Sequence, residues 1–243
     1  MLETDKLSEY KKSFEDNGFV LLKDFFSKEV SENIVRYADE LQEWKEEKFK
    51  WMLYYEKNRD KNNEKKKARM EHFINYHTEI NQLVTSLKET IEFIYGEKLN
   101  LFKDKINWKY GGGEGFKAHQ DQPAWTDFPP SRYVTLALSA DNTTNENGCL
   151  QFVNACHKNG LYEYDENGNG EIKLDNQNKM EWNYISTTPR DILLFDSYAP
   201  HRSYKNTTDK SRRIFYFTYN EEKYGDLYNK YFEKKRQEIP TDI

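Results

Sequence analysis

Apolar residues in the N-terminal part of the chain recur at steps of three and four, the spacing of one face of a helix. Leu7, Tyr10 and Phe14 follow this spacing, and Gly18 interrupts it. Ser27 supplies the side-chain oxygen that caps a helix start, and a new apolar series follows it. The pattern predicts helices over residues 5–17, over 27–41 and within 72–95, with a short buried strand at 19–22.

The stretch from 43 to 71 is dominated by Lys and Glu, and Trp44, Trp51, Tyr54 and Tyr55 are scattered through it. Charges of both signs are mixed there, which is typical of a solvated surface rather than of a basic arm. We therefore predict a solvated helix or loop. A lid over a substrate site is the alternative interpretation.

The pattern changes after Gly96, where short alternating or apolar runs are separated by Gly, Asn, Asp and Pro, as in an all-β region. No linker separates this region from the helical one, so a single domain is expected, with helices packed on a β-barrel or double sheet. We place helical support at about 1–98, a β core at about 99–220 and a C-terminal tail at 221–243. The predicted core strands are 101–109, 132–140, 149–153, 183–187, 191–195 and 212–219.

Composition narrows the class of protein. Only 36% of the 243 residues are hydrophobic and 33% are charged, but 16% are aromatic, enough to build a core. The net charge of −5 argues against a nucleic-acid partner, and the apolar runs are too short to span a membrane. The first residues lack the layout of a secretion signal, and two cysteines cannot make a disulfide framework. A cytoplasmic location is therefore expected.

His119-Gln120-Asp121 and the distant His201 are the residues that most clearly indicate chemistry. On a strand, His119 and Asp121 would point to the same side, because side chains alternate with period two. Two imidazoles and one carboxylate form the facial triad of non-haem Fe(II) oxygenases, which leaves metal positions open for a co-substrate and dioxygen. The alternative is that these are three unrelated structural residues.

Arg212 begins the last predicted core strand, eleven residues after His201. A guanidinium there can pair bidentately with a carboxylate. A metal together with such an arginine is what 2-oxoglutarate requires, because its keto-acid end chelates iron while its far carboxylate needs a fixed cation. Ser203 follows His201 by two residues and is expected to add a hydroxyl to that carboxylate.

Other polar and aromatic residues are weaker candidates for the site. Lys105 and Asn107 share a strand face with Lys109, and this face either lines the cavity, to bind 2-oxoglutarate or an anionic substrate, or lies exposed. Each of the others has a structural alternative, as a strand cap or a core residue. They are Thr135 for 2-oxoglutarate, Arg132 for an anion, and Trp125 and Tyr198 for the wall of a substrate pocket.

The spacing of His119, Asp121, His201, Ser203 and Arg212 resembles that of the phytanoyl-CoA dioxygenase family of Fe(II)/2-oxoglutarate oxygenases. The resemblance extends over about residues 10–220. It implies a double-stranded β-helix, the cupin-type jelly roll, flanked by helices. It also implies Fe(II) held by the two histidines and the aspartate, 2-oxoglutarate as co-substrate, and dioxygen as oxidant.

Several longer stretches resemble the branch of this family that hydroxylates 2-aminoethylphosphonate and related alkylphosphonates. The resemblance implies a dioxygenase that hydroxylates a small organophosphonate at the carbon next to phosphorus, with Lys105, Asn107 and Arg132 as partners for its oxygens. The alternatives are the same mechanism on another small polar metabolite or natural-product scaffold, and a non-catalytic cupin-like binding protein. The oligomeric state stays open. The stretches are 105–109, 111–116, 119–125, 147–150 and 212–220.

Overall fold

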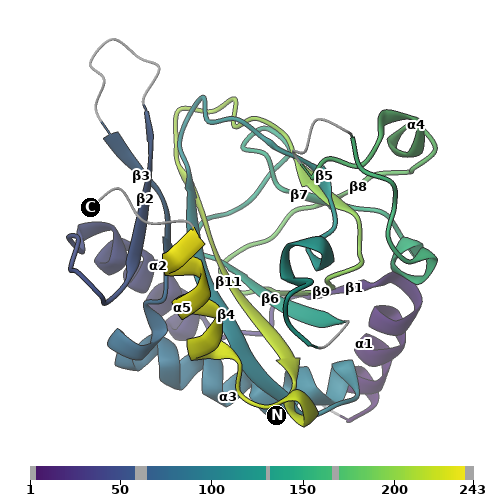
Figure 1. Cartoon of the computed structure of the whole chain (residues 1–243), viewed down its shortest axis with the longest axis horizontal. Coiled ribbons are helices and arrows are strands. Elements are labelled where there is room, and N and C mark those ends of the chain that lie inside the picture. Colours follow the sequence, from purple (N-terminus) through teal and green to yellow (C-terminus); the bar gives the residue numbers. More distant parts are fainter. Residues whose placement is uncertain (1–3, 58–64, 130–131, 166–169, 239–243) are drawn as a thin grey trace.

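The computed structural model describes residues 4–57, 65–129, 132–165 and 170–238, and its strands form two antiparallel sheets (Figure 1). The minor sheet has the order β5 (Phe116–His119), β10 (His201–Ser203), β7 (Leu150–Phe152) and β8 (Asn183–Ile185). The major sheet has the order β1 (Phe19–Leu22), β9 (Ile192–Asp196), β6 (Tyr133–Ser139), β11 (Arg212–Glu221), β4 (Leu99–Lys109), β3 (Lys65–Glu71) and β2 (Met52–Lys57).

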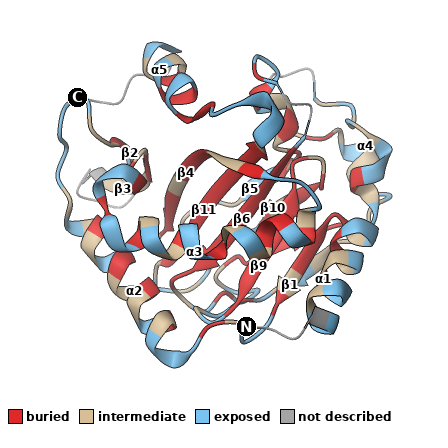
Figure 2. Cartoon of the chain, turned by 90° about the horizontal axis from the view of Figure 1, so that it is seen from below, coloured by how far each residue is buried: buried red, intermediate tan, exposed pale blue. Residues whose placement is uncertain are grey.

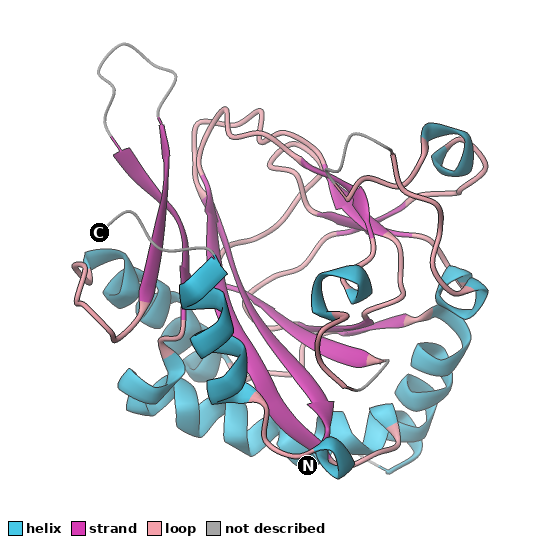
Figure 3. Ribbon diagram, in the orientation of Figure 1, coloured by secondary structure: helices cyan, strands magenta, loops and turns pink. Residues whose placement is uncertain are grey.

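Helices cover the face of the major sheet that points away from the minor sheet (Figures 2 and 3). They are α1 (Thr4–Asn17), α2 (Lys28–Glu43) and α3 (Thr78–Tyr95), whereas α5 (Tyr228–Glu238) packs beside β4. Short helical turns occur at η1 (Ile74–Tyr76), η2 (Gln122–Trp125), η3 (Cys156–Asn159), α4 (Leu174–Gln177) and η4 (Glu222–Tyr224). Among the described residues, no helix combines the length and apolar character that crossing a membrane requires.

Side-chain alternation along β11 gives the major sheet two different faces. Phe215 and Phe217 point into the large core beneath the helices. Ile214 and Tyr216 point the other way, into a smaller cluster with Phe152 of the minor sheet. The space between the sheets is therefore lined by the even-numbered residues of β11 and by their partners on β4 and β6.

The structure confirms most of the elements predicted from the apolar pattern. The helix at 5–17 is α1, the strand at 19–22 is β1, and Ser27 caps α2 by accepting a hydrogen bond from the Val30 amide at 3.3 Å. Within 72–95, α3 begins at Thr78, after η1. The six predicted core strands correspond to β4, β6, β7, β8, β9 and β11.

The prediction of a solvated helix or loop over residues 43–71 was wrong for residues 52–57 and 65–71. The segment contributes β2 and β3 to the edge of the major sheet, and its residues 58–64 lie outside the described part of the chain. Met52, Leu53 and Met70 are fully buried there, so the strands dock through a few apolar residues among many charged ones. The pattern also missed β5, β10 and α5.

Candidate active site

His119, Asp121 and His201 lie together between the two sheets, with one ligand atom of each within 4.8 Å of the others. His201 on β10 lies directly opposite His119 on β5 in the antiparallel pair, and the centroids of the two imidazole rings are 4.2 Å apart. Asp121 lies beyond the end of β5, in the turn that leads into η2. The expected strand alternation of His119 and Asp121 is therefore wrong, and the turn brings the carboxylate to the two rings.

Backbone carbonyl groups fix the orientation of both imidazoles. His119 Nδ1 lies 2.6 Å from the Lys117 carbonyl oxygen, and His201 Nδ1 lies 3.0 Å from that of Ala199. Each Nδ1 therefore carries the proton, and each Nε2 presents its lone pair. Both Nε2 atoms face Asp121 Oδ1, at 3.7 and 4.0 Å. The donor set of two imidazoles and a carboxylate fits Fe(II).

The environment also favours the protonation states that bind a metal. Burial lowers the pKa of His201 to about 4, so its ring is neutral near pH 7. Burial alone would raise the pKa of Asp121, but the electrostatic interactions with His201 and Lys105 outweigh it and lower that pKa.

Gln120, between the two ligands of the motif, holds the surrounding loops together. Its buried amide nitrogen donates to the carbonyl groups of Gly160 at 2.8 Å and Tyr198 at 2.7 Å. Its oxygen accepts from the Tyr162 amide and the Tyr164 hydroxyl, both at 2.9 Å. All four hydrogen-bonding positions of the side chain are used. Gln120 thus links the metal motif to the turn before His201.

Arg212 lies next to Lys109 in the β11–β4 register and is only 2% exposed. Its Nε and Nη1 atoms have no hydrogen-bond partner among the residues that the structure describes. Lys109 Nζ donates to Ser203 Oγ and to the Tyr204 carbonyl oxygen, both at 2.7 Å, and so connects β4 to β10. Leaving buried guanidinium donors unpaired is costly, so this arrangement fits a bound carboxylate.

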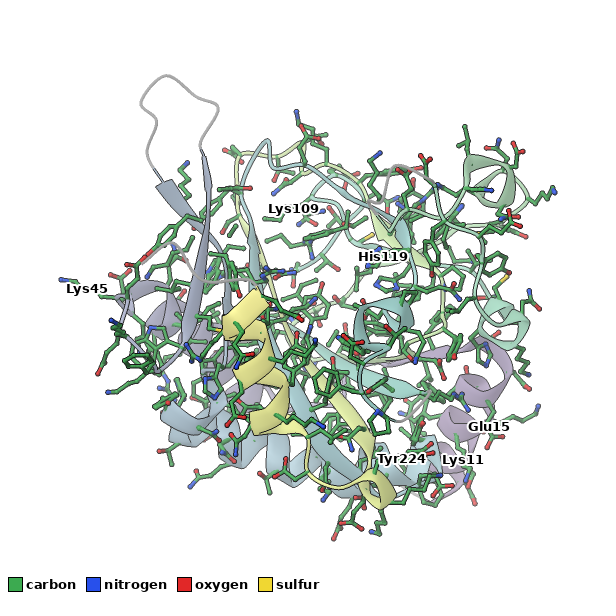
Figure 4. All side chains as sticks on the ribbon, in the orientation of Figure 1. Lys11, Glu15, Lys45, Lys109, His119 and Tyr224 are labelled. Carbon is green, nitrogen blue, oxygen red and sulfur yellow. The ribbon has the colours of Figure 1, made fainter. Side chains whose placement is uncertain are left out.

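Lys109 and His119 lie on the same side of the molecule, toward the minor sheet, whereas Lys11 and Glu15 lie on α1 (Figure 4). Burial lowers the pKa of Lys109 to about 7, and the neighbouring charge of Arg212 acts in the same direction. An anion bound there would favour the charged ammonium.

Three further candidates face the space between the sheets. Lys105 and Asn107 are partners of Tyr216 and Ile214 on β11, so this strand face points between the sheets and is not an exposed face. Thr135 Oγ1 lies 3.0 Å from Thr218 Oγ1. Phe195, the β9 partner of Thr135, contacts His201 with ring centroids 5.0 Å apart.

Two of the remaining three candidates, Arg132 and Trp125, have structural partners. Arg132 Nε donates to the buried Asp196 at 2.6 Å, and the guanidinium lies over the Tyr95 ring. Trp125 is 2% exposed and packs edge-on against Tyr133. Tyr198 lies in the turn before His201, half-buried.

Sequence reasoning missed Lys103, Arg69, Glu71 and the role of Lys109. Lys103 and Lys109 belong to the alternating series on β4, so the same period that indicated Lys105 could have found them. Arg69 and Glu71 gave no usable signal, because nothing in the charged segment marks which of its residues turn inward.

Comparison with known proteins gives one family for nearly the whole chain. Residues 14–214 match the phytanoyl-CoA dioxygenase family. A 2-aminoethylphosphonate dioxygenase from uncultured bacterium HF130_AEPn_1 is 38% identical over 96% of this chain and 89% of the relative. A methylphosphonate hydroxylase from Gimesia maris is 36% identical over 90% of this chain and 83% of the relative.

Solved structures agree on the fold. The non-haem α-ketoglutarate-dependent epimerase SnoN from nogalamycin biosynthesis has a TM-score of 0.74 at 16% identity, covering 90% of this chain and 84% of that one. EctD from S. alaskensis with bound Fe has a TM-score of 0.73 at 17% identity, covering 92% and 78%. At these identities the likeness concerns the fold, and it confirms the jelly roll.

Proposed function

The chain belongs to the phytanoyl-CoA dioxygenase family of Fe(II)- and 2-oxoglutarate-dependent dioxygenases, and we propose that it hydroxylates a small organophosphonate at the carbon next to phosphorus. The observation that carries this proposal is a match of nine-tenths or more of the chain to two phosphonate-oxidising relatives. The cationic inner face of β4 supports it. A phosphonate carries up to two negative charges and three acceptor oxygens, so it needs donors of this kind.

His119, Asp121 and His201 are the proposed iron ligands. The support is the convergence of one carboxylate oxygen and two Nε2 atoms, with both Nδ1 atoms bound to backbone carbonyl groups. Three protein ligands leave coordination positions for 2-oxoglutarate and dioxygen. The rings of Phe152 and Phe195 pack on His201 and exclude water from one side of the centre.

Arg212, Lys109 and Ser203 are proposed to hold the far carboxylate of 2-oxoglutarate. Arg212 offers unpaired donors, Lys109 a second positive charge, and Ser203 a hydroxyl that already accepts from Lys109. Ser203 also accepts from the Phe116 amide at 3.3 Å, which fixes its position relative to β5. Thr135 and Asn107, further along the inner face, are proposed to contact the co-substrate or the substrate.

When bound, iron and 2-oxoglutarate supply the oxidation: one oxygen atom of dioxygen enters succinate as carbon dioxide is released, and the other enters the substrate C–H bond. The chain's own part is to anchor both anions and to orient one C–H bond toward the metal. Lys105 is proposed to bind phosphonate oxygens, since its ammonium group lies near Asp121. Tyr198 is proposed to line the entrance.

We also propose a cytoplasmic location and a small anionic substrate as the chief partner. Free thiols at Cys149 and Cys156 are compatible with a reducing compartment. The lysines on the inner face of β4 support a negative charge on the substrate.

Anaerobic difference spectra of the Fe(II)- and 2-oxoglutarate-loaded protein test the proposal. Adding 2-aminoethylphosphonate or methylphosphonate should perturb the metal-to-ligand band, and admitting oxygen should then release succinate in step with substrate loss. The phosphorus NMR chemical shift of the product should be that of a phosphonate hydroxylated at the adjacent carbon. If no phosphonate raises succinate above the uncoupled background and another substrate class does, the substrate assignment fails. If succinate never forms with any substrate, the non-catalytic alternative holds.

A further inference from the structure

The edge of the major sheet places four polar side chains together on its inner face. In the β3–β4 register, Arg69 is opposite Asn107, and Glu71 is opposite Lys105. Directly opposed residues of an antiparallel pair share a face, and so do residues two apart. Met70 and Ile106, between them, are fully buried in the core beneath the helices. The four polar side chains therefore point toward the space that contains the triad.

Glu71 and Asn107 are buried, Arg69 and Lys105 are partly buried, and the four side chains are incompletely paired. Asn107 Oδ1 has no hydrogen-bond partner in the described part of the chain. Arg69 Nε and Glu71 Oε1 form an ion pair with each other at 3.1 Å and make no further hydrogen bond to a described residue. The Lys105 ammonium group lies 4.7 Å from the centroid of the Tyr216 ring and makes no hydrogen bond to a described residue. Unpaired buried polar groups cost free energy unless a ligand completes them. This cluster is therefore suited to a polar ligand.

Positive charge is in excess around the cluster. Lys103, 7% exposed, approaches the Tyr231 ring of α5, and Lys235 of the same helix forms an ion pair with Glu71. Arg69, Lys103, Lys105 and Lys235 thus face the single carboxylate of Glu71, with Asp121 of the triad next to them. Although burial favours its neutral acid, Lys235, Lys103 and Arg69 lower the pKa of Glu71 to about 2, so the carboxylate stays charged. The surplus favours an anion.

The Arg69 guanidinium is held in a defined orientation. It lies over the Tyr54 ring of β2 at 4.2 Å, and its Nε is 3.1 Å from Glu71 Oε1. The side chain keeps 36% of its surface exposed, so its terminal nitrogens remain accessible. A guanidinium stacked on a ring and backed by a carboxylate presents a planar pair of donors, which suits bidentate contact with phosphonate oxygens.

This cluster is separate from the site proposed for 2-oxoglutarate. Lys105 and Lys109 lie four positions apart on the same face of β4, about 13 Å along an extended strand. Lys105 is nevertheless close enough to Asp121 for the two charges to affect each other's pKa. The inner face of β4 therefore offers one cationic group for each of two anions.

We propose that Arg69 and Lys105 bind the phosphonate group of the substrate, and that Glu71, paired with Lys235, positions the Arg69 guanidinium. This inference rests on the proposed function and extends it. It makes the β2–β3 hairpin and α5 parts of the substrate site. Arg69 and Lys105 contact the substrate, whereas Glu71 acts through Arg69.

The test compares Arg69→Gln, Arg69→Lys and Lys105→Met with Arg36→Gln as the matched control. Arg36 pairs with Glu40 and Glu79 on the helical layer, far from the sheet interior. Each variant, loaded anaerobically with Fe(II) and 2-oxoglutarate, is titrated with methylphosphonate and 2-aminoethylphosphonate. Arg69→Gln and Lys105→Met should raise the Kd for phosphonate by more than about tenfold, with 2-oxoglutarate affinity within about twofold of wild type. Arg69→Lys should raise the Kd for phosphonate by a smaller factor, and Arg36→Gln should leave it unchanged.

Glu71→Gln tests the positioning role. It should raise the KM for phosphonate by about three- to tenfold while kcat changes little, because the Arg69 donors remain but are less well oriented. A general loss of structure would instead raise the KM for 2-oxoglutarate as well. Equal losses for both ligands would overturn the positioning role.

The outcomes separate this inference from the proposed function. A wild-type protein that responds to no phosphonate overturns both. A wild-type protein that binds phosphonate, with Arg69→Gln binding it equally well, overturns only the role of Arg69. If Arg69→Gln does not fold, as judged by circular dichroism, then Arg69→Lys and Lys105→Met decide. Wild-type phosphonate affinity in both of those variants overturns the inference.

Discussion

The two ends of the inner face of β4 are alike in charge and different in construction. At one end, Lys109 lies beside Arg212 in register, and both are almost fully buried. At the other end, Lys105 lies beside Arg69 and Glu71 from β3, where Arg69 remains partly exposed. The first group is built on two long central strands. The second depends on an edge hairpin and on the C-terminal helix.

This difference matches the tasks that we propose for the two groups. A co-substrate that is the same in every turnover is best held by a rigid pair of central strands. The phosphonate group of the substrate is proposed to bind at a sheet edge, where Arg69 keeps part of its surface exposed to an entering ligand. The predictions below test whether the two ends act separately.

Removal of a metal ligand should have the largest effect. It should abolish turnover whichever end of the inner face of β4 is intact. His119→Ala, Asp121→Ala or His201→Ala is expected to abolish turnover and to weaken iron binding, because only three protein groups hold the ion. Succinate release and the iron content of the reloaded protein are the measurements. Near wild-type activity in any one variant would remove that residue from the site.

Arg212→Ala should damage the co-substrate end alone. Loss of a buried charge-assisted pair costs about 2–5 kcal/mol, and each ~1.4 kcal/mol is tenfold, so the KM for 2-oxoglutarate should rise by more than about tenfold. Arg212→Lys should recover only part of this, since it lacks the planar fork. The anaerobic Kd for phosphonate is measured in parallel and should change little.

Arg213 provides the matched control for that experiment. Its guanidinium is paired with Asp141 at 2.9 Å and with Asp39, on the opposite face of β11. Arg213→Ala should therefore lower thermal stability and leave the KM for 2-oxoglutarate unchanged. A large rise in that KM for Arg213→Ala, with none for Arg212→Ala, would mean that the roles of the two arginines are reversed.

The pH dependence of 2-oxoglutarate binding should report the state of Lys109. Burial lowers the pKa of Lys109 to about 7. At higher pH its side chain is a neutral amine, which must take up a proton before it can pair with a carboxylate. Affinity is thus expected to be highest below the pKa and to fall by up to about tenfold per pH unit above it. Anaerobic titrations between about pH 6.5 and 8.5 measure this. Lys109→Met should bind more weakly at low pH and lose most of the slope, and a wild-type slope in that variant would contradict the assignment.

Arg132→Gln should have the smallest effect on either ligand. Arg132 is paired with the buried Asp196, so its replacement leaves a carboxylate without its partner and should lower the free energy of unfolding by about 1–3 kcal/mol. The KM for phosphonate should stay within about twofold of wild type. Chemical denaturation and steady-state kinetics measure the two quantities. A tenfold rise in that KM would return Arg132 to the substrate site.

Local spacing in the sequence was enough to predict α1, α2 and α3, six of the core strands, and the metal and co-substrate candidates. Helical and strand periods depend only on which residues are apolar, and the jelly roll and family followed from the resemblance carried by His119, Asp121, His201 and Arg212. The alternation along β4 also predicted that Lys105 and Asn107 share a face. These features are encoded by residues that are neighbours in sequence or are set at a characteristic spacing.

Tertiary structure alone decided which charges turn inward. Arg69 and Glu71 lie in a segment that resembles any solvated charged stretch, and only the pairing of β3 with β4 places them opposite Asn107 and Lys105. The same holds for Lys235, which reaches Glu71 only because α5 packs beside β4. Arg132 is the opposite case. The sequence predicted that its guanidinium could bind an anion, but in the structure it is paired with Asp196. The alternation of side chains along a strand predicts which residues share a face. Contacts between segments that are distant in sequence decide which residues that face packs against.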